Sequence, residues 1–146
     1  MTSRRLLAVD SSVVVAVIRK EQDHEFLREE MKSSDCVMSA MNRVEVETVI
    51  FAKRKEAGCQ ELHQLLVEVK MTIHPINEQM VQTAIESWKH YGTSGKHEAQ
   101  LNMGDSFAYA LSKELRAPLM CIGNDFIHTD LDLALPRHII ERHPST

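Results

Sequence analysis

The fold is decided by the stretch LLAVDSSVVVAVI, residues 6–18, in which an apolar run stops at one acid and resumes after two serines. The run Leu6–Val9 is short and continuous, which is typical of a buried strand in a parallel sheet. Asp10 can act as a helix N-cap, and the residues from Ser11 to about Lys20 predict a helix. A strand that leads directly into a helix is the usual opening of an α/β fold.

The same alternation continues along the chain. We expect strands at 36–39, 71–73 and 119–122 and a weak strand at 131–134, with helices at 24–32, 42–57, 62–69, 78–91 and 102–116. The helix at 42–57 is expected to end at Gly58, a common helix-end residue. The tail beyond Pro136 is polar and is expected to be peripheral. No repeat or linker divides residues 1–146, so we predict one α/β domain whose parallel sheet is covered by helices on both faces.

Composition narrows the class of protein. The 146 residues are 43% hydrophobic and 26% charged, which is ordinary globular usage. A net charge of −4 argues against a general nucleic-acid binder with a broad basic surface, but it does not exclude RNA as a substrate. The three cysteines have no paired spacing, and Cys36 and Cys121 fall in expected strands, which indicates a reducing cytoplasm. No signal peptide is visible and no stretch is long enough to span a membrane, so no membrane association is expected.

Four acids stand at the ends of expected strands or near the starts of the helices that follow them. They are Asp10, Glu45, Asp105 and Asp125. In open α/β sheets, ligands bind beyond the carboxyl ends of the strands, so these carboxylates are expected to meet there. Like charges repel one another unless a cation lies between them, and oxygen ligands suit Mg²⁺ or Mn²⁺. Phosphate esters are natural substrates of such a site.

Three of these acids also have explanations that need no metal. Asp10 can cap the helix that follows it, and Asp105 stands three residues after Asn102, as in a capping box. Asp125 can be a turn residue. Capping and metal binding are compatible, because a carboxylate oriented by backbone N–H groups still has oxygen lone pairs for a cation.

Glu45 is harder to explain as a surface residue. No basic residue lies three or four positions from it, whereas its neighbour Glu47 has Arg43 four residues back. We therefore expect Glu47 to form a surface ion pair and Glu45 to point inward. An inward carboxylate without a cationic partner needs a metal or a proton.

These residues resemble the PIN-domain family, and within it the VapC-like toxins of prokaryotic toxin–antitoxin pairs. The resemblance rests on four segments in order, namely VDSS at 9–12, SAMNRVE at 39–45, LNMGDSFAYAL at 101–111, and GNDF at 123–126 followed by Thr129-Asp130. The family implies a compact three-layer α/β/α sandwich with a short parallel sheet. One departure is Asn124, where many relatives carry a second acid, which leaves the number of bound metals open.

The resemblance also implies an activity. It implies a divalent-metal-dependent endoribonuclease, with Mg²⁺ or Mn²⁺ held by the catalytic residues Asp10, Glu45, Asp105 and Asp125. It further implies a toxin that forms a homodimer and a cognate antitoxin protein that covers the acidic groove. The RNA that is cut, whether transfer, ribosomal or messenger RNA, is not implied.

Further residues are candidates for supporting roles. Ser12, Asn124, Thr129 and Asp130 are candidates for an outer shell that acts through water or hydrogen bonds. Lys96 and His97 stand in a glycine-containing loop before Asp105 and are candidates for contacts with the RNA backbone. A loop histidine can equally be exposed without a role.

Other functions fit the sequence less well. The histidines, among them His138 and His143, lack the paired spacing of a zinc protease, and no glycine-rich loop follows the first strand. A phosphatase with an aspartyl nucleophile would usually carry a second acid where Ser12 stands, and a response-regulator receiver would need an acid near His74. The stronger alternative is a catalytically silent PIN-like module that binds RNA or protein.

Overall fold

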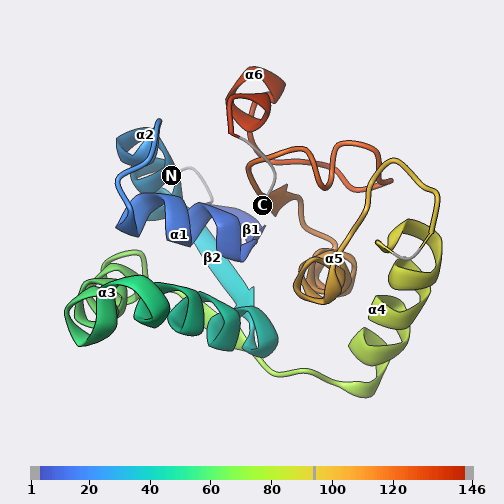
Figure 1. Cartoon of the computed structure of the whole chain (residues 1–146), viewed down its shortest axis with the longest axis horizontal. Coiled ribbons are helices and arrows are strands. Elements are labelled where there is room, and N and C mark those ends of the chain that lie inside the picture. Colours follow the sequence, from blue (N-terminus) through green and yellow to red (C-terminus); the bar gives the residue numbers. More distant parts are fainter. Residues whose placement is uncertain (1–3, 94, 144–146) are drawn as a thin grey trace.

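A computed structural model describes residues 4–93 and 95–143 and places a parallel sheet between two layers of helices (Figure 1). The elements are, in chain order, β1 (Arg5–Val9), α1 (Ser11–Ile18), α2 (His24–Lys32), β2 (Ser34–Ser39), α3 (Ala40–Glu68), β3 (Thr72–His74), α4 (Glu78–Tyr91), α5 (Met103–Leu115), β4 (Leu119–Met120) and α6 (Arg137–Glu141). The strands lie in the order β3-β2-β1-β4 and are all parallel. The predicted α/β/α sandwich with a short parallel sheet is confirmed.

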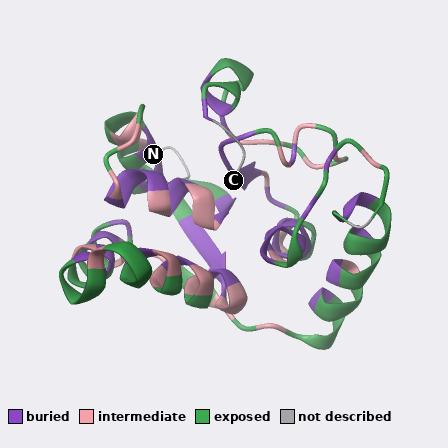
Figure 2. Cartoon of the chain, viewed as in Figure 1, coloured by how far each residue is buried: buried purple, intermediate pink, exposed green. Residues whose placement is uncertain are grey.

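Alternate residues of the strands pack into two separate hydrophobic cores, because successive side chains of a strand point to opposite faces of the sheet. Leu7 and Val9 pack into the core formed with α1, α2, α3 and α6. Ala8 and Val37 pack into the core formed with α4 and α5. Buried residues accordingly line the sheet and the inner faces of the helices, while the outer faces are exposed (Figure 2).

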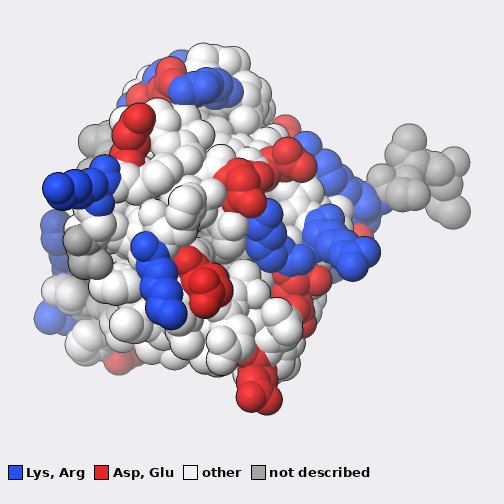
Figure 3. Space-filling view, turned by 90° about the vertical axis from the view of Figure 1, so that its right-hand side faces the viewer, with Lys and Arg blue, Asp and Glu red and all other residues white. Residues whose placement is uncertain are grey.

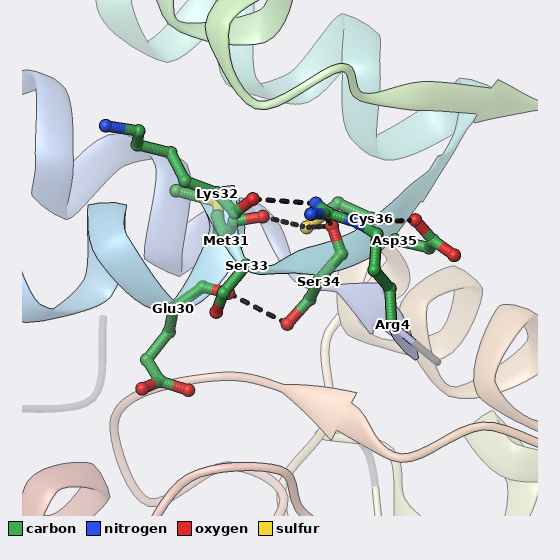
Figure 4. A network of polar contacts seen from close by, with 8 residues as sticks. All are labelled: Arg4, Glu30, Met31, Lys32, Ser33, Ser34, Asp35 and Cys36. Carbon is green, nitrogen blue, oxygen red and sulfur yellow. Dashed lines mark hydrogen bonds and ion pairs between the residues drawn. The ribbon is translucent and has the colours of Figure 1, made fainter. Parts of the chain in front are cut away.

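The junction between α2 and β2 is tied to the start of β1 by a compact network (Figure 4). The Arg4 guanidinium donates hydrogen bonds to the carbonyl oxygens of Lys32 (2.6 Å) and Ser34 (2.7 Å) and to the Asp35 carboxylate (3.0 Å). The Ser34 hydroxyl donates to the carbonyl of Glu30 at 2.8 Å. These bonds support the pairing of β1 with β2 where the two strands begin. The four candidate acids lie toward the opposite end of this part of the sheet.

The break in the long helix is displaced from its predicted place. Within α3 the backbone leaves helical geometry at Lys55, with φ 52° and ψ −150°, whereas Gly58 lies inside the second part of the helix. A Cβ at Gly58 would lie 2.5 Å from Cβ of Arg54 and 2.9 Å from Cγ2 of Ile50. Glycine at this position therefore serves the close packing of the two parts of α3 and does not end the helix.

The C-terminal end differs more from expectation. The weak strand predicted at 131–134 is present only as a single bridge between Leu133 and Leu119. The expectation of a polar, peripheral tail is wrong, because Ile139 and Ile140 of α6 are buried and His143 is 4% exposed. Two apolar residues in an otherwise polar tail are too few for a periodic signal, although they are enough to seat a short helix. Among the described residues, no helix has the length and apolarity needed to cross a membrane.

Candidate active site

A cavity of about 170 Å³ opens beyond the carboxyl ends of β1 and β4 and brings together the four predicted acids. Its lining comprises Asp10, Ser11, Ser12, Val15, Arg19, Glu21, Glu45, Val49, Asn102, Asp105, Ile122 and Asp125. The acids come from four places in the chain, namely the end of β1, helix α3, the first turn of α5 and the turn after β4. This arrangement matches the sequence expectation that the carboxyl edge of the sheet collects them.

Asp10 is the most buried of the four, with 3% of its surface exposed. It is the N-cap of α1, and its Oδ2 accepts a hydrogen bond from the backbone N–H of Ser12 at 3.2 Å. Its Oδ1 is buried and has no hydrogen-bond partner. Burial raises the pKa of Asp10 to about 6, and the negative charges of Glu45 and Asp125 add to the rise while hydrogen bonds from Ser12 oppose it.

Asp105 is held by the capping box that its spacing from Asn102 predicted. Its carboxylate accepts a hydrogen bond from the Asn102 N–H at 3.0 Å, and the Asn102 side chain accepts one from the Asp105 N–H at 2.9 Å. Burial raises the pKa of Asp105 to about 8, and the negative charge of Asp10 contributes to the rise. The cap and the acidic cluster therefore use the same residue.

Glu45 points into the cavity, as its lack of a basic neighbour predicted. Its Oε1 accepts hydrogen bonds from the Ser11 hydroxyl at 2.6 Å and from the Asn42 side-chain amide at 3.2 Å. The same Asn42 amide donates to the carbonyl of Gly104 at 3.0 Å, which joins α3 to α5. Glu47, by contrast, pairs with Arg43 at 2.8 Å on the surface, also as expected.

The candidates for an outer shell have different surroundings. Ser12 lines the cavity with the acids, and its Oγ accepts a hydrogen bond from the N–H of Ile122 at 3.4 Å. Asn124 is exposed at the turn before Asp125 and is not one of the residues that line the cavity. Thr129 donates to the carbonyl of Phe126 at 2.8 Å, within its own turn.

Asp130 belongs to another part of the molecule. Its carboxylate accepts hydrogen bonds from the Tyr109 hydroxyl at 2.6 Å and from Lys113 Nζ at 2.8 Å. It lines a separate cavity between α4 and α5, with Tyr91 and His90. The sequence analysis named Asp130 as a candidate for the outer shell, but the turn after Phe126 carries it to Tyr109 and Lys113 of α5.

The two candidates for RNA contacts lie outside the acidic cavity. Lys96 is exposed, and Nδ1 of His97 accepts a hydrogen bond from the N–H of Ala99 at 3.0 Å. The His97 ring lies 4.8 Å from that of Tyr91. On the face that includes α4, Lys and Arg are interspersed with Asp and Glu and do not form one basic surface (Figure 3).

Sequence reasoning missed several residues of the site. Ser11 contacts Glu45, while Ser12 was the serine expected to act. Arg19 and Glu21 border the cavity, and their charged groups lie 3.9 Å apart. The spacing of Asn42 from Glu45 offered a signal for that contact, because residues three apart share a helix face. The sequence marked Arg19 only as part of Arg19-Lys20, one of several basic clusters, and its place at the cavity depends on how α1 ends.

The donor set suits a hard divalent cation. All four acids offer oxygen, which Mg²⁺ and Mn²⁺ prefer, and the unpartnered Oδ1 of Asp10 is a buried acceptor that a cation would satisfy. Within residues 4–93 and 95–143, no three His, Cys, Asp or Glu side chains are already grouped closely enough to hold one ion. Binding would therefore require the carboxylates to turn toward a common point.

Comparison with known proteins gives a consistent result. A family profile described as the PIN domain matches residues 7–132. Ribonuclease VapC28 of Mycobacterium tuberculosis is 31% identical over 132 residues, covering 90% of this chain and 99% of the relative. Ribonuclease VapC30 of the same species is 33% identical over 132 residues, covering 89% of this chain and all of the relative, 100%.

Solved structures share the fold at lower identity. The M. tuberculosis toxin VapC20, described as cleaving the sarcin–ricin loop, superposes with a TM-score of 0.69 at 12% identity, covering 89% of this chain and 99% of that one. VapBC2 from Rickettsia felis, bound to a DNA fragment from its promoter, gives a TM-score of 0.69 at 16% identity, with 88% and 97% covered. At these identities the likeness concerns the fold alone.

Proposed function

This chain belongs to the PIN-domain family, and we propose that it is a divalent-metal-dependent endoribonuclease, the toxin of a toxin–antitoxin pair. The observation that carries the proposal is one cavity that Asp10, Glu45, Asp105 and Asp125 all line, together with the buried Oδ1 of Asp10, which has no hydrogen-bond partner. Support for the reaction comes from relatives at 31% and 33% identity that are named ribonucleases. We also propose that the protein acts in the cytoplasm.

Each acid would have a defined part in holding Mg²⁺ or Mn²⁺. Asp10 and Asp105 would supply oxygens from carboxylates that helix caps already orient. Glu45 and Asp125 would approach from the other sides of the cavity. A bound divalent ion lowers the pKa of water and stabilises negative charge on a phosphate, which is the chemistry that phosphodiester hydrolysis needs.

Arg19 is the proposed contact for the substrate phosphate. Among the described residues that line the cavity, it is the one that carries a positive charge, and its side chain is 30% exposed. A guanidinium binds phosphate oxygens with two parallel hydrogen bonds. Arg19 would therefore orient the scissile phosphate against the acidic cluster and offset part of its negative charge.

The decisive experiment is cleavage of defined tRNA and rRNA fragments with Mg²⁺, with Mn²⁺ and with EDTA. Asp10→Asn and Glu45→Gln should remove most activity, whereas Glu47→Gln, two residues away on the surface, should remain close to wild type. Metal binding without cleavage of any RNA would instead favour the silent binding module. Cleavage that survives both EDTA and Asp10→Asn would refute the proposed site.

We propose that a cognate antitoxin covers the acidic cavity. Solved structures of the same fold include a toxin–antitoxin complex from Klebsiella pneumoniae, at 12% identity and a TM-score of 0.66. The negative charge of the cavity favours a partner that inserts a basic side chain. Co-purification with a candidate antitoxin protein, followed by an RNA cleavage assay, would test whether that protein binds this chain and inhibits it.

We further propose a homodimer that uses α4 and the start of α5. Apolar residues of α3 are mostly core and unavailable for association, because Ile50, Leu62 and Leu65 are buried. Exposed apolar side chains instead line a groove of about 370 Å³ between α4 and α5, with Ile85, Trp88 and Met103 among them. Light scattering should report a dimer that Ile85→Glu converts to a monomer, and a wild-type monomer would reject the proposal.

A further inference from the structure

The C-terminal segment 137–143 lies beyond residues 7–132, which match the PIN-domain profile. It comprises α6 and the two residues after it, and α6 lies on the side of the molecule that also carries α2 (Figure 1). Ile139 and Ile140 anchor this segment in the core that α1 and α2 share. The segment is therefore a built part of the fold, and its polar contacts have fixed positions.

One end of this segment binds the turn between α1 and α2. Arg142 Nη2 lies 3.2 Å from Asp23 Oδ1, and Nε2 of the buried His143 lies 3.3 Å from Asp23 Oδ2, without the alignment of a hydrogen bond. Asp23 is the N-cap of α2, yet its side chain makes no capping hydrogen bond and its backbone is left-handed, with φ 66°. Its carboxylate therefore does not accept a hydrogen bond from the first turn of α2, as an N-cap acid usually does, and instead faces the C-terminal segment.

The same segment also holds the turn that carries Asp125. The backbone N–H of Gly123 donates a hydrogen bond to the carbonyl of Ile140 at 3.0 Å. Gly123 has a left-handed backbone, with φ 86°, and lies between the cavity residues Ile122 and Asp125. This hydrogen bond to α6 therefore helps to fix the backbone that leads into Asp125.

Two rims of the acidic cavity are joined in this way. Arg19 and Glu21 border the cavity just before Asp23, and Ile122 and Asp125 border it on either side of Gly123. We propose that the segment 137–143 is a C-terminal clamp that positions both rims, with Arg142 and His143 as positioning residues. Any effect of the clamp on the reaction rests on the proposed function. Its effect on the structure of residues 19–23 and 122–126 does not.

The test compares hydrogen exchange of the full-length, metal-free chain with binding of Mn²⁺. Asp23→Asn keeps the shape and the left-handed preference of the residue but removes its charge, and Arg142→Gln removes the partner. Both variants should lose amide protection at residues 19–23 and 122–126. The amide protection of the helices should stay as in the wild type. Both should also bind Mn²⁺ about tenfold more weakly, as is typical when a supporting residue of a metal site is removed.

Two control variants separate positioning from general stability. Arg142→Lys keeps the charge and should restore wild-type exchange, and Arg137→Gln removes only the exposed pair of Arg137 with Glu141, so it should change neither reading. Unchanged protection at both rims in Asp23→Asn and Arg142→Gln would overturn the clamp, as would a loss spread evenly over the chain. Failure of the wild-type chain to bind Mn²⁺ would count against the proposed metal site, while the exchange data would still decide the clamp.

Discussion

Glu45 occupies the space that a side chain at position 104 would need. A Cβ on Gly104 would lie 2.2 Å from Glu45 Oε2, so α5 approaches α3 closely enough only because residue 104 has no side chain. The acid next along α5 is Asp105, and both carboxylates line the same cavity. The glycine therefore sets how near these two acids can come.

Gly104→Ala should separate activity from stability. The new methyl group would displace the end of a flexible Glu45 side chain, and alanine favours the helix by up to about 1 kcal/mol relative to glycine. We expect the free energy of unfolding to change little, while RNA cleavage falls by roughly a hundredfold because Glu45, a proposed metal ligand, is misplaced. Urea unfolding and single-turnover cleavage would measure the two effects.

Gly58→Ala is the matched contrast. Its methyl group would meet Cβ of Arg54, which is bound to the backbone and cannot turn away. Stability should fall by about 1–3 kcal/mol, as for other overpacked sites, with cleavage preserved well below the unfolding temperature. Equal losses of activity in the two variants would argue against a specific role for Gly104.

The metal-free protein should become less stable as pH rises from about 4 to about 8. Burial holds the pKa of Asp10 near 6 and that of Asp105 near 8, against 3.8 in the unfolded chain, so over this range the folded state binds more protons than the unfolded state. Urea unfolding in EDTA at several pH values would measure the slope. Asp105→Asn should flatten its upper part, and stability that is constant or rises over this interval would contradict the assignment.

Arg19→Gln should lower kcat/KM for RNA cleavage without unfolding the chain. Loss of a charge-assisted hydrogen bond to phosphate costs about 1.5–3 kcal/mol, which corresponds to roughly ten- to a hundredfold in kcat/KM. Steady-state kinetics on a defined RNA would measure this ratio. Lys53→Gln, which removes an exposed positive charge elsewhere, serves as the control and should have little effect.

Asp130→Asn should affect stability and leave the proposed metal site unchanged. The substitution weakens contacts with Tyr109 and the exposed Lys113, and exposed ion pairs contribute at most about 1 kcal/mol. Mn²⁺ affinity, measured by calorimetry, should match that of the wild type. A clear loss of affinity would return Asp130 to the outer shell that its place in the sequence suggested.

The elements and the acids followed from sequence because both have local causes. Strand Leu6–Val9 and the cap Asp10 depend on neighbouring residues, and the capping box of Asp105 depends on a residue three positions away. The collection of acids at one edge then follows from the parallel sheet alone. Glu45 could be predicted to point inward because no basic residue lies three or four positions from it in the helix.

The remaining features depend on contacts between distant residues. Asp23 meets Arg142 and His143 across more than a hundred positions, and no local pattern marks that pairing. The break in α3 lies at Lys55, which no local pattern marks, whereas Gly58 is the residue that the sequence favoured as the helix end. Asp130 is the converse case, because the sequence made it a candidate for the outer shell while the turn after Phe126 carries it to Tyr109 and Lys113.

The outer strands of the sheet also bear on how copies of this protein can meet. At one edge, β3 has three residues and is followed by Pro75, and at the other, two-residue β4 is covered by backbone hydrogen bonds of Leu119 with Asp132 and Ala134. Strands this short or already covered give an incoming strand little to pair with, which guards against sheet-to-sheet aggregation. The outer strands therefore favour association between folded copies through helical surfaces over pairing of sheet edges.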